Sequence, residues 1–193
     1  MALSRSSEQD DIAPAVLGEN MTADEYLAMP ATQQHNLIEG TLYESPTPGL
    51  RHDEVLAAVA SALGAHVLEA GGKSFVAPVE CRLSESTVLQ PDAGYVARAH
   101  QGMAARGNIM GAPDLVVEVL SKGTRRFDSE QKLGAYARNG VREAWLVDPD
   151  NETVIVYCGD GSKWMDRQLV NFGADIPSEL VSVGEAGLLA LRR

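Results

Sequence analysis

Two acidic side chains interrupt segments that otherwise have the composition of buried β-strands. Glu118 lies within "PDLVVEVLS" (113–121), and Asp92 lies within "TVLQPDAGYVA" (87–97). An isolated ionised carboxylate is costly to bury, so such groups are usually paired, protonated or bound to a metal. Each acid taken alone fits an exposed edge position equally well. Two acids late in probable neighbouring strands favour a divalent-metal site, and carboxylate oxygens suit Mg²⁺ or Mn²⁺.

A third acid and a cation would complete such a site. Glu39, in the segment "NLIEGTL", has a similarly apolar setting, and two lysines compete for the cationic role. Lys122 shares strand parity with Glu118, but four strand residues place it roughly 13 Å along. Lys132 lies in the predicted following helix and could fold back over the strand end. It could also form a solvent-facing pair with Asp128, four residues before it.

The elements that must position these residues follow the order α-β-α-β-β-β-α-β-β. Apolar periodicity and turn residues predict the helices and strands. Helices are predicted at 22–29, 51–69 and 124–139, and strands at 74–83, 87–97, 113–121, 142–149 and 152–158, with 163–170 extending the meander. Residues 36–44 are predicted as a strand or a hairpin, with a kink or turn at Gly40. This order predicts an α/β fold with one mixed sheet and helices packed against it. The strand-helix-strand unit at 114–148 is expected to be a parallel crossover.

Length and composition limit the class of protein. The chain has 193 residues, enough for one domain with a sizeable core. We expect a flexible tail at residues 1–20 and a single domain at 21–193. No apolar run approaches the roughly 20 residues of a membrane helix, and acidic residues interrupt the N-terminus where a signal peptide would be apolar. With only two isolated cysteines, these features predict a cytoplasmic protein without membrane contact.

The charge of the chain bears on its partners. The formal net charge is -11, which argues against a broad non-specific binder of phosphate backbones. A local basic patch can nevertheless matter more than the total charge. The cluster "KGTRRF" (122–127) follows directly on the strand of Glu118, although it fits a solvated charged loop equally well.

Five motifs occur in order along the chain between about residues 21 and 160: "LIEG", "RH", "QPD", "GAPDLVVEVLS" and "QKLGAYARNGVREAWLVDP". This series resembles the Uma-two family of restriction endonucleases, which belongs to the PD-(D/E)XK nuclease superfamily. The resemblance implies a restriction-endonuclease-like fold: a mixed central sheet flanked by helices. It also implies that Asp92 is the metal-binding aspartate of the superfamily and Glu118 its second acid.

The lysine of this superfamily normally stands two residues after the second acid. This chain has Leu120 at that position, so the resemblance selects Lys132, in the following helix, as the lysine of the site. Glu39 corresponds to the acid contributed by the early "LIEG" segment. The implied function is a Mg²⁺-dependent endonuclease, with Mn²⁺ as a second usable metal, that hydrolyses DNA phosphodiester bonds.

The residues then have distinct expected roles. Asp92 and Glu118 hold the metal, Lys132 stabilises developing charge or orients the attacking water, and Glu39 completes the metal or water shell. Expected contacts with the nucleic-acid backbone are Arg51, His52, Lys122, Arg125 and Arg126. A homodimer is expected by analogy with related restriction-type folds.

A rival hypothesis is a catalytically silent module that binds nucleic acid or protein on the same fold. The acidic net charge favours this alternative, whereas the intact set of four site residues opposes it. An enzyme that acts on a small phosphoester is a third hypothesis, which the sequence disfavours because it shows no nucleotide-base pocket.

Overall fold

The computed structural model describes residues 14–30, 35–45, 47–105 and 107–183. The helical segments are α1 (Ala23–Leu27), α2 (Leu50–Ala70), the 3-10 helix η1 (Arg98–Met103), the π-helical turn η2 (Phe127–Lys132) and α3 (Leu133–Arg138). The strands are β1 (Val16–Gly18), β2 (His35–Ile38), β3 (Thr41–Glu44), β4 (Lys73–Val76), β5 (Cys81–Ser84), β6 (Thr87–Leu89), β7 (Ala93–Val96), β8 (Ala104–Ala105), β9 (Asn108–Met110), β10 (Leu115–Val119), β11 (Glu143–Asp148), β12 (Thr153–Gly159) and β13 (Trp164–Asn171). Of the described helices, none is long and apolar enough to span a bilayer.

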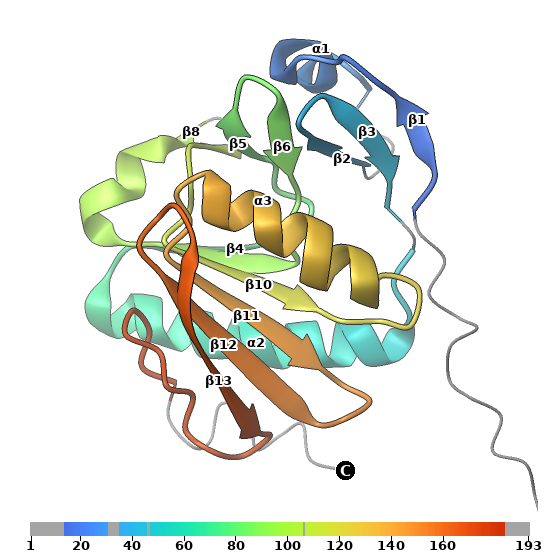
Figure 1. The fold of residues 1–193 in the computed structure, drawn as a ribbon. Helices are drawn as coiled ribbons and strands as arrows, with labels where there is room; N and C mark the ends of the chain where they lie inside the picture. The colour runs from blue at the N-terminus through green and yellow to red at the C-terminus, as the bar shows by residue number, and fades with distance from the viewer. Residues whose placement is uncertain (1–13, 31–34, 46, 106, 184–193) are drawn as a thin grey trace, which may run out of the picture.

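A six-stranded mixed sheet forms the centre of the molecule, as predicted (Figure 1). Its strand order is β13-β12-β11-β10-β7-β4, and β10 and β11 are the parallel pair joined by η2 and α3. Helix α2 covers one face of this sheet, and η2 with α3 covers the other (Figure 1). The pattern of a strand, a helix and a parallel strand at 114–148 is therefore confirmed.

A second sheet, with the order β1-β3-β2-β6-β5-β9-β8, was not predicted from the sequence. It arises because each of the long predicted strands 74–83 and 87–97 divides into two shorter ones. Strand β4 gives way to β5 across Pro78, and β6 gives way to β7 across Pro91. Proline cannot donate a hydrogen bond to a strand ladder, so each strand ends there and the chain passes between the sheets.

Strand β10 carries the apolar run that surrounds Glu118, and its side chains alternate between two cores. Leu115, Val117 and Val119 pack in the core that includes α2. Val116 and Leu120 pack in the core that includes η2 and α3. Since successive strand side chains point to opposite faces, Glu118 points toward η2 and α3.

The N-terminal region is part of the folded domain from at least β1 onward. This strand pairs with β3 through Val16 and Tyr43, so the segment predicted as a flexible tail at 1–20 includes a strand. Residues 1–13 of that predicted tail lie outside the described part of the chain. Helix α1 begins with a capping box, in which the side chains of Thr22 and Glu25 accept hydrogen bonds from each other's backbone N–H.

Candidate functional site

Antiparallel pairing between β7 and β10 brings Asp92 to Glu118. Val117 pairs with Ala93, so the residue that precedes Ala93 lies beside the residue that follows Val117. Asp92 therefore stands just before the start of its strand, rather than late in it as predicted. Its Oδ2 atom accepts a hydrogen bond of 2.7 Å from the backbone N–H of Val119, which fixes the carboxylate at the end of β10.

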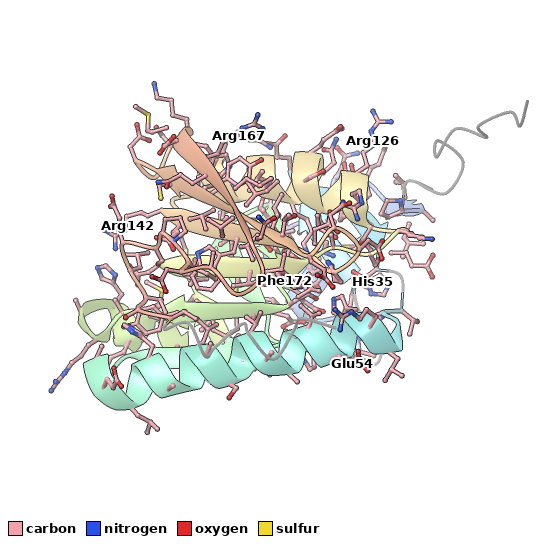
Figure 2. All side chains as sticks on the ribbon, turned by 90° about the horizontal axis from the view of Figure 1, so that it is seen from below. His35, Glu54, Arg126, Arg142, Arg167 and Phe172 are labelled. Carbon is pink, nitrogen blue, oxygen red and sulfur yellow. The ribbon has the colours of Figure 1, made fainter. Side chains whose placement is uncertain are left out.

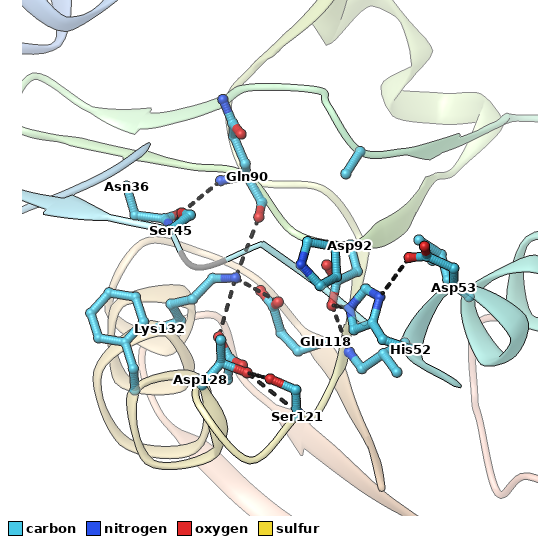
Figure 3. Close-up of a pocket in the computed structure, with 16 residues that line it drawn as sticks. Asn36, Ser45, His52, Asp53, Gln90, Asp92, Glu118, Ser121, Asp128 and Lys132 are labelled. Carbon is cyan, nitrogen blue, oxygen red and sulfur yellow. Dashed lines mark hydrogen bonds and ion pairs between the residues drawn. The ribbon is translucent and has the colours of Figure 1, made fainter. Parts of the chain in front are cut away.

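Lys132 extends from the end of η2 into the same pocket (Figure 3). Its Nζ atom donates to Glu118 Oε2 at 2.5 Å and to the Gln90 carbonyl oxygen at 3.3 Å. The same ammonium lies 3.5 Å from Asp128 Oδ1. Lys132 is only 5% exposed, so its pair with Asp128 is buried, and the alternative of a solvent-facing pair is wrong.

Glu118 is 2% exposed, and both of its oxygens accept hydrogen bonds. Tyr136 OH donates to Oε1 at 2.5 Å, while Lys132 occupies Oε2. Burial and the nearby Asp92 and Asp128 raise the pKa of Glu118 to about 8, against the opposing effect of Lys132. Burial alone would lower the pKa of Lys132, but the surrounding carboxylates outweigh it and raise that pKa. The lining of the pocket contains more acidic than basic side chains.

His52, from the first turn of α2, contacts Asp92 directly. Its Nε2 lies 3.1 Å from Asp92 Oδ2, and its Nδ1 lies 3.2 Å from Asp53 Oδ1. Burial lowers the pKa of His52, but both carboxylates outweigh this effect and raise it above the ordinary value. His52 thus contacts Asp92 in this structure, and its contact with the nucleic-acid backbone stays a prediction.

Glu39 does not join the other predicted site residues, which corrects the expectation from its apolar neighbours. It occupies the turn between β2 and β3 with a φ of 49°, next to Gly40 with a φ of 82°. This left-handed turn directs the side chain outward, where it is 63% exposed and lies 2.9 Å from the guanidinium of Arg138. Glu39 therefore belongs to a surface ion pair outside the pocket.

The predicted basic contacts are mostly engaged with acidic side chains. Their partners are Glu54 for Arg51, Asp148 and Asp150 for Arg125, and Glu130 for Arg126. Arg126 points outward from the helical segment, away from the sheets (Figure 2). Lys122 is exposed in the loop that follows β10. These positions leave the basic cluster around the pocket largely neutralised.

Two residues that contact Lys132 or Glu118 were not predicted from the sequence as part of the site. Asp128 was considered only as a solvent-exposed partner of Lys132, yet it is buried in the pocket. Tyr136 was not proposed as a site residue, yet its hydroxyl donates a hydrogen bond to Glu118. The spacing of four residues from Asp128 to Lys132 and again to Tyr136 was the available signal, because such side chains lie on one side of a helix.

The donor set of the pocket fits a hard divalent cation. Asp92, Glu118 and Asp128 line a pocket of about 200 Å³, and oxygen donors are the ligands that Mg²⁺ prefers. Within the described residues, Asp92 Oδ1 accepts no hydrogen bond and is available as a ligand. In the same part of the chain, no three His, Cys, Asp or Glu side chains are already grouped as a metal site.

Comparisons with known proteins agree with this fold. The model of the Uma2 family, described as "Putative restriction endonuclease", matches residues 23–188. A solved structure described as a "putative nuclease belonging to DUF820", from Anabaena variabilis ATCC 29413, is similar with a TM-score of 0.71 and 22% sequence identity. The similarity covers 89% of this chain and 99% of that chain, and at this identity it shows the fold. Among curated proteins, none matches the sequence.

Proposed function

This chain belongs to the Uma2 family, and we propose that it is a metal-dependent endonuclease that hydrolyses DNA phosphodiester bonds. One observation carries the proposal. The ammonium of Lys132 donates a hydrogen bond to Glu118, and Asp92 lines the same pocket, although the three residues come from different parts of the chain. The printed descriptions of the family and of the similar structure, both of which name nucleases, support the same chemistry.

Asp92 and Glu118 would hold Mg²⁺ or Mn²⁺. When bound, the cation would polarise the scissile phosphate and lower the pKa of an attacking water. The chain itself keeps the two acids in place. His52 and the N–H of Val119 hold Asp92 Oδ2, and Tyr136 holds Glu118 Oε1. Fixed donors of this kind need little reorganisation during the reaction.

Lys132 would act on the phosphate or on the attacking water. Its ammonium is already inside the pocket, where charge interactions are stronger than in bulk water. There it can donate to an oxygen on which negative charge develops, or orient a water molecule. This role corresponds to that of the superfamily lysine, supplied from η2 because position 120 is an apolar Leu120 in the core.

A non-catalytic binding module remains the second candidate function. The observation that favours it is the neutralisation of Arg51, Arg125 and Arg126 by acidic neighbours, together with the net charge of -11. Such a surface attracts a phosphate backbone weakly. The convergence of Asp92, Glu118 and Lys132 in one pocket favours catalysis, because a purely binding surface has no need of such a group of ionisable side chains.

The test is cleavage of supercoiled plasmid, linear duplex, single-stranded DNA and RNA with Mg²⁺, with Mn²⁺ or with a chelator. We expect metal-dependent cutting of DNA by the wild type and a loss of about 10²–10³-fold in Asp92→Ala. Asp166→Ala is the control, because it removes an exposed carboxylate of β13 and should cut as the wild type does. Absence of cutting of every nucleic acid with either metal would refute the nuclease assignment.

A further inference from the structure

Two buried carboxylates, those of Glu118 and Asp128, share a single ammonium in the pocket, and the partly exposed Asp92 lies beside them. Asp92 and Glu118 are the proposed metal ligands, and Asp128 is the third acid. Asp128 is 4% exposed and comes from η2, the same turn that carries Lys132. One lysine cannot neutralise both Glu118 and Asp128, and uncompensated buried charge is destabilising. Asp128 therefore needs an explanation beyond the superfamily site.

The contacts of Lys132 are unequal. Its Nζ lies 2.5 Å from Glu118 Oε2 but 3.5 Å from Asp128 Oδ1. The two carboxylates lie in different directions from the nitrogen (Figure 3). An ammonium has three donors, so Lys132 can strengthen one contact when another weakens. A divalent cation on Glu118 would compete with the ammonium for that carboxylate and repel it.

The π-helical turn keeps Asp128 next to Lys132. The N–H of Leu133 donates to the carbonyl oxygen of Asp128, five residues earlier, which is the bond that defines a π-turn. The side chains of Asp128 and Lys132 both line the pocket and are buried from solvent. Asp128 and Lys132 thus belong to the same helical turn, η2, whereas Glu118 belongs to strand β10.

We propose that Asp128 is a positioning residue that holds the Lys132 ammonium in the pocket while a divalent cation occupies Glu118. The inference rests on the proposed metal-dependent function. Asp128 acts through Lys132 and is not itself a metal ligand, in agreement with the absence of a ready group of three ligands among the described side chains. Without Asp128, the lysine would keep only Glu118 and the Gln90 carbonyl oxygen as partners, and it would oppose a metal on Glu118 more strongly.

The test is a double-mutant cycle in which calorimetry measures the dissociation constant for Mn²⁺. We expect Asp128→Asn to raise this constant about tenfold in the wild-type background. Lys132→Met should lower it, because a competing cation is removed. In the Lys132→Met background, Asp128→Asn should change it at most about threefold. Glu130→Gln is the matched control, since it removes an exposed acid of the same turn and should stay within about twofold.

A second measurement covers the case in which Lys132→Met does not fold. In protein labelled with ¹⁵N-lysine, a buried and hydrogen-bonded ammonium exchanges its protons slowly with water. We expect the Lys132 Nζ signal to persist after Mg²⁺ is added to the wild type and to be lost in Asp128→Asn. Glu130→Gln should behave as the wild type does.

Three results would overturn the inference. Equal losses of Mn²⁺ affinity in both backgrounds would make Asp128 a direct ligand. An unchanged Mn²⁺ affinity in Asp128→Asn would show that Asp128 has no effect on metal binding. Failure of the wild type to bind Mn²⁺ would overturn the inference, because no cation would then occupy Glu118. If such a protein still cut DNA in the presence of a chelator, it would nevertheless be a nuclease. Mn²⁺ binding without cutting would instead refute the proposed function alone.

Discussion

At the scale of single residues, Arg125 shows how a side chain suited to phosphate binding can serve the fold. Its guanidinium donates to both oxygens of Asp148, the buried last residue of β11. Asp148 Oδ1 also accepts the backbone N–H of Asp150 and of Asn151, each at 3.1 Å. Burial opposes ionisation, but the bonds from Arg125 and Asn151 lower the pKa of Asp148 to about 2. The pair ties the start of η2 to the turn after β11.

This ion pair predicts how stability depends on pH. Because the folded pKa of Asp148 is below its unfolded value, the carboxylate stabilises the fold above about pH 4 and loses this effect as the pH falls toward 2. We expect Asp148→Asn to lower the free energy of unfolding by roughly 1–2 kcal/mol at pH 7 and by clearly less at pH 3. Urea unfolding at several pH values measures both. Asp150→Asn, an exposed change in the same turn, should cost less than about 0.5 kcal/mol. A loss for Asp148→Asn that is constant from pH 7 to pH 3 would contradict this explanation.

At the scale of elements, the pairing of β4, β7 and β10 places Asp92. Gly94, in the middle strand of the three, has no room for a side chain. A Cβ atom there would lie 2.4 Å from Phe75 Cζ and 2.8 Å from the Leu115 carbonyl oxygen. The close approach of these strands therefore depends on glycine, and Asp92 lies two residues before it.

Enlarging Gly94 should disturb both the sheet and the site. We expect Gly94→Ala to lower the free energy of unfolding by about 2–3 kcal/mol, because overpacked backbone must move. Gly102→Ala is the matched control, since no atom lies within 4 Å of its Cβ position. Thermal and urea unfolding measure the difference. If the free energies of unfolding of Gly94→Ala and of the control differ by less than about 0.5 kcal/mol, the prediction is contradicted, because β7 then tolerates the added methyl group.

The sequence predicted the site better where it lies on regular elements than where it depends on turns. Glu118 and Asp92 were found because an acid in an apolar strand is conspicuous, and pairing of their strands brings them together. The helix after β10 was predicted, and Lys132 with it. Its π-turn was not predicted, because a single extra residue in a helical turn leaves the apolar periodicity almost unchanged.

Glu39 shows the opposite case. Its apolar neighbours, Leu37 and Ile38, are indeed buried, but the acid follows them at a tight turn. Hydrophobic pattern does not reveal the turn conformation that directs the side chain outward. In the same way, Pro78 and Pro91 marked interruptions in long strands, but nothing in the local sequence indicated that the chain changes sheets there.

At the scale of the whole molecule, the charge and the pocket together suggest how a phosphate backbone would approach. The net charge of -11 repels nucleic acid, and the arginines nearest the pocket are paired with acids. The proposed binding to DNA would therefore rely on a divalent cation in the pocket more than on surface lysines and arginines. The overall fold, matched over 89% of the chain, supplies the positions of the site residues, whereas the local chemistry decides the activity.

The most direct test of the proposed site compares two lysines, because the lysine expected at position 120 has to come from another element. Mg²⁺-dependent plasmid nicking should be measured for the wild type, Lys132→Met and Lys122→Met, with folding checked by circular dichroism. The site predicts a loss of about 10²–10³-fold for Lys132→Met, and at most about tenfold for the exposed Lys122→Met, whose expected role is a contact with the nucleic-acid backbone. Full activity in a folded Lys132→Met variant, or a comparable loss in Lys122→Met, would contradict it.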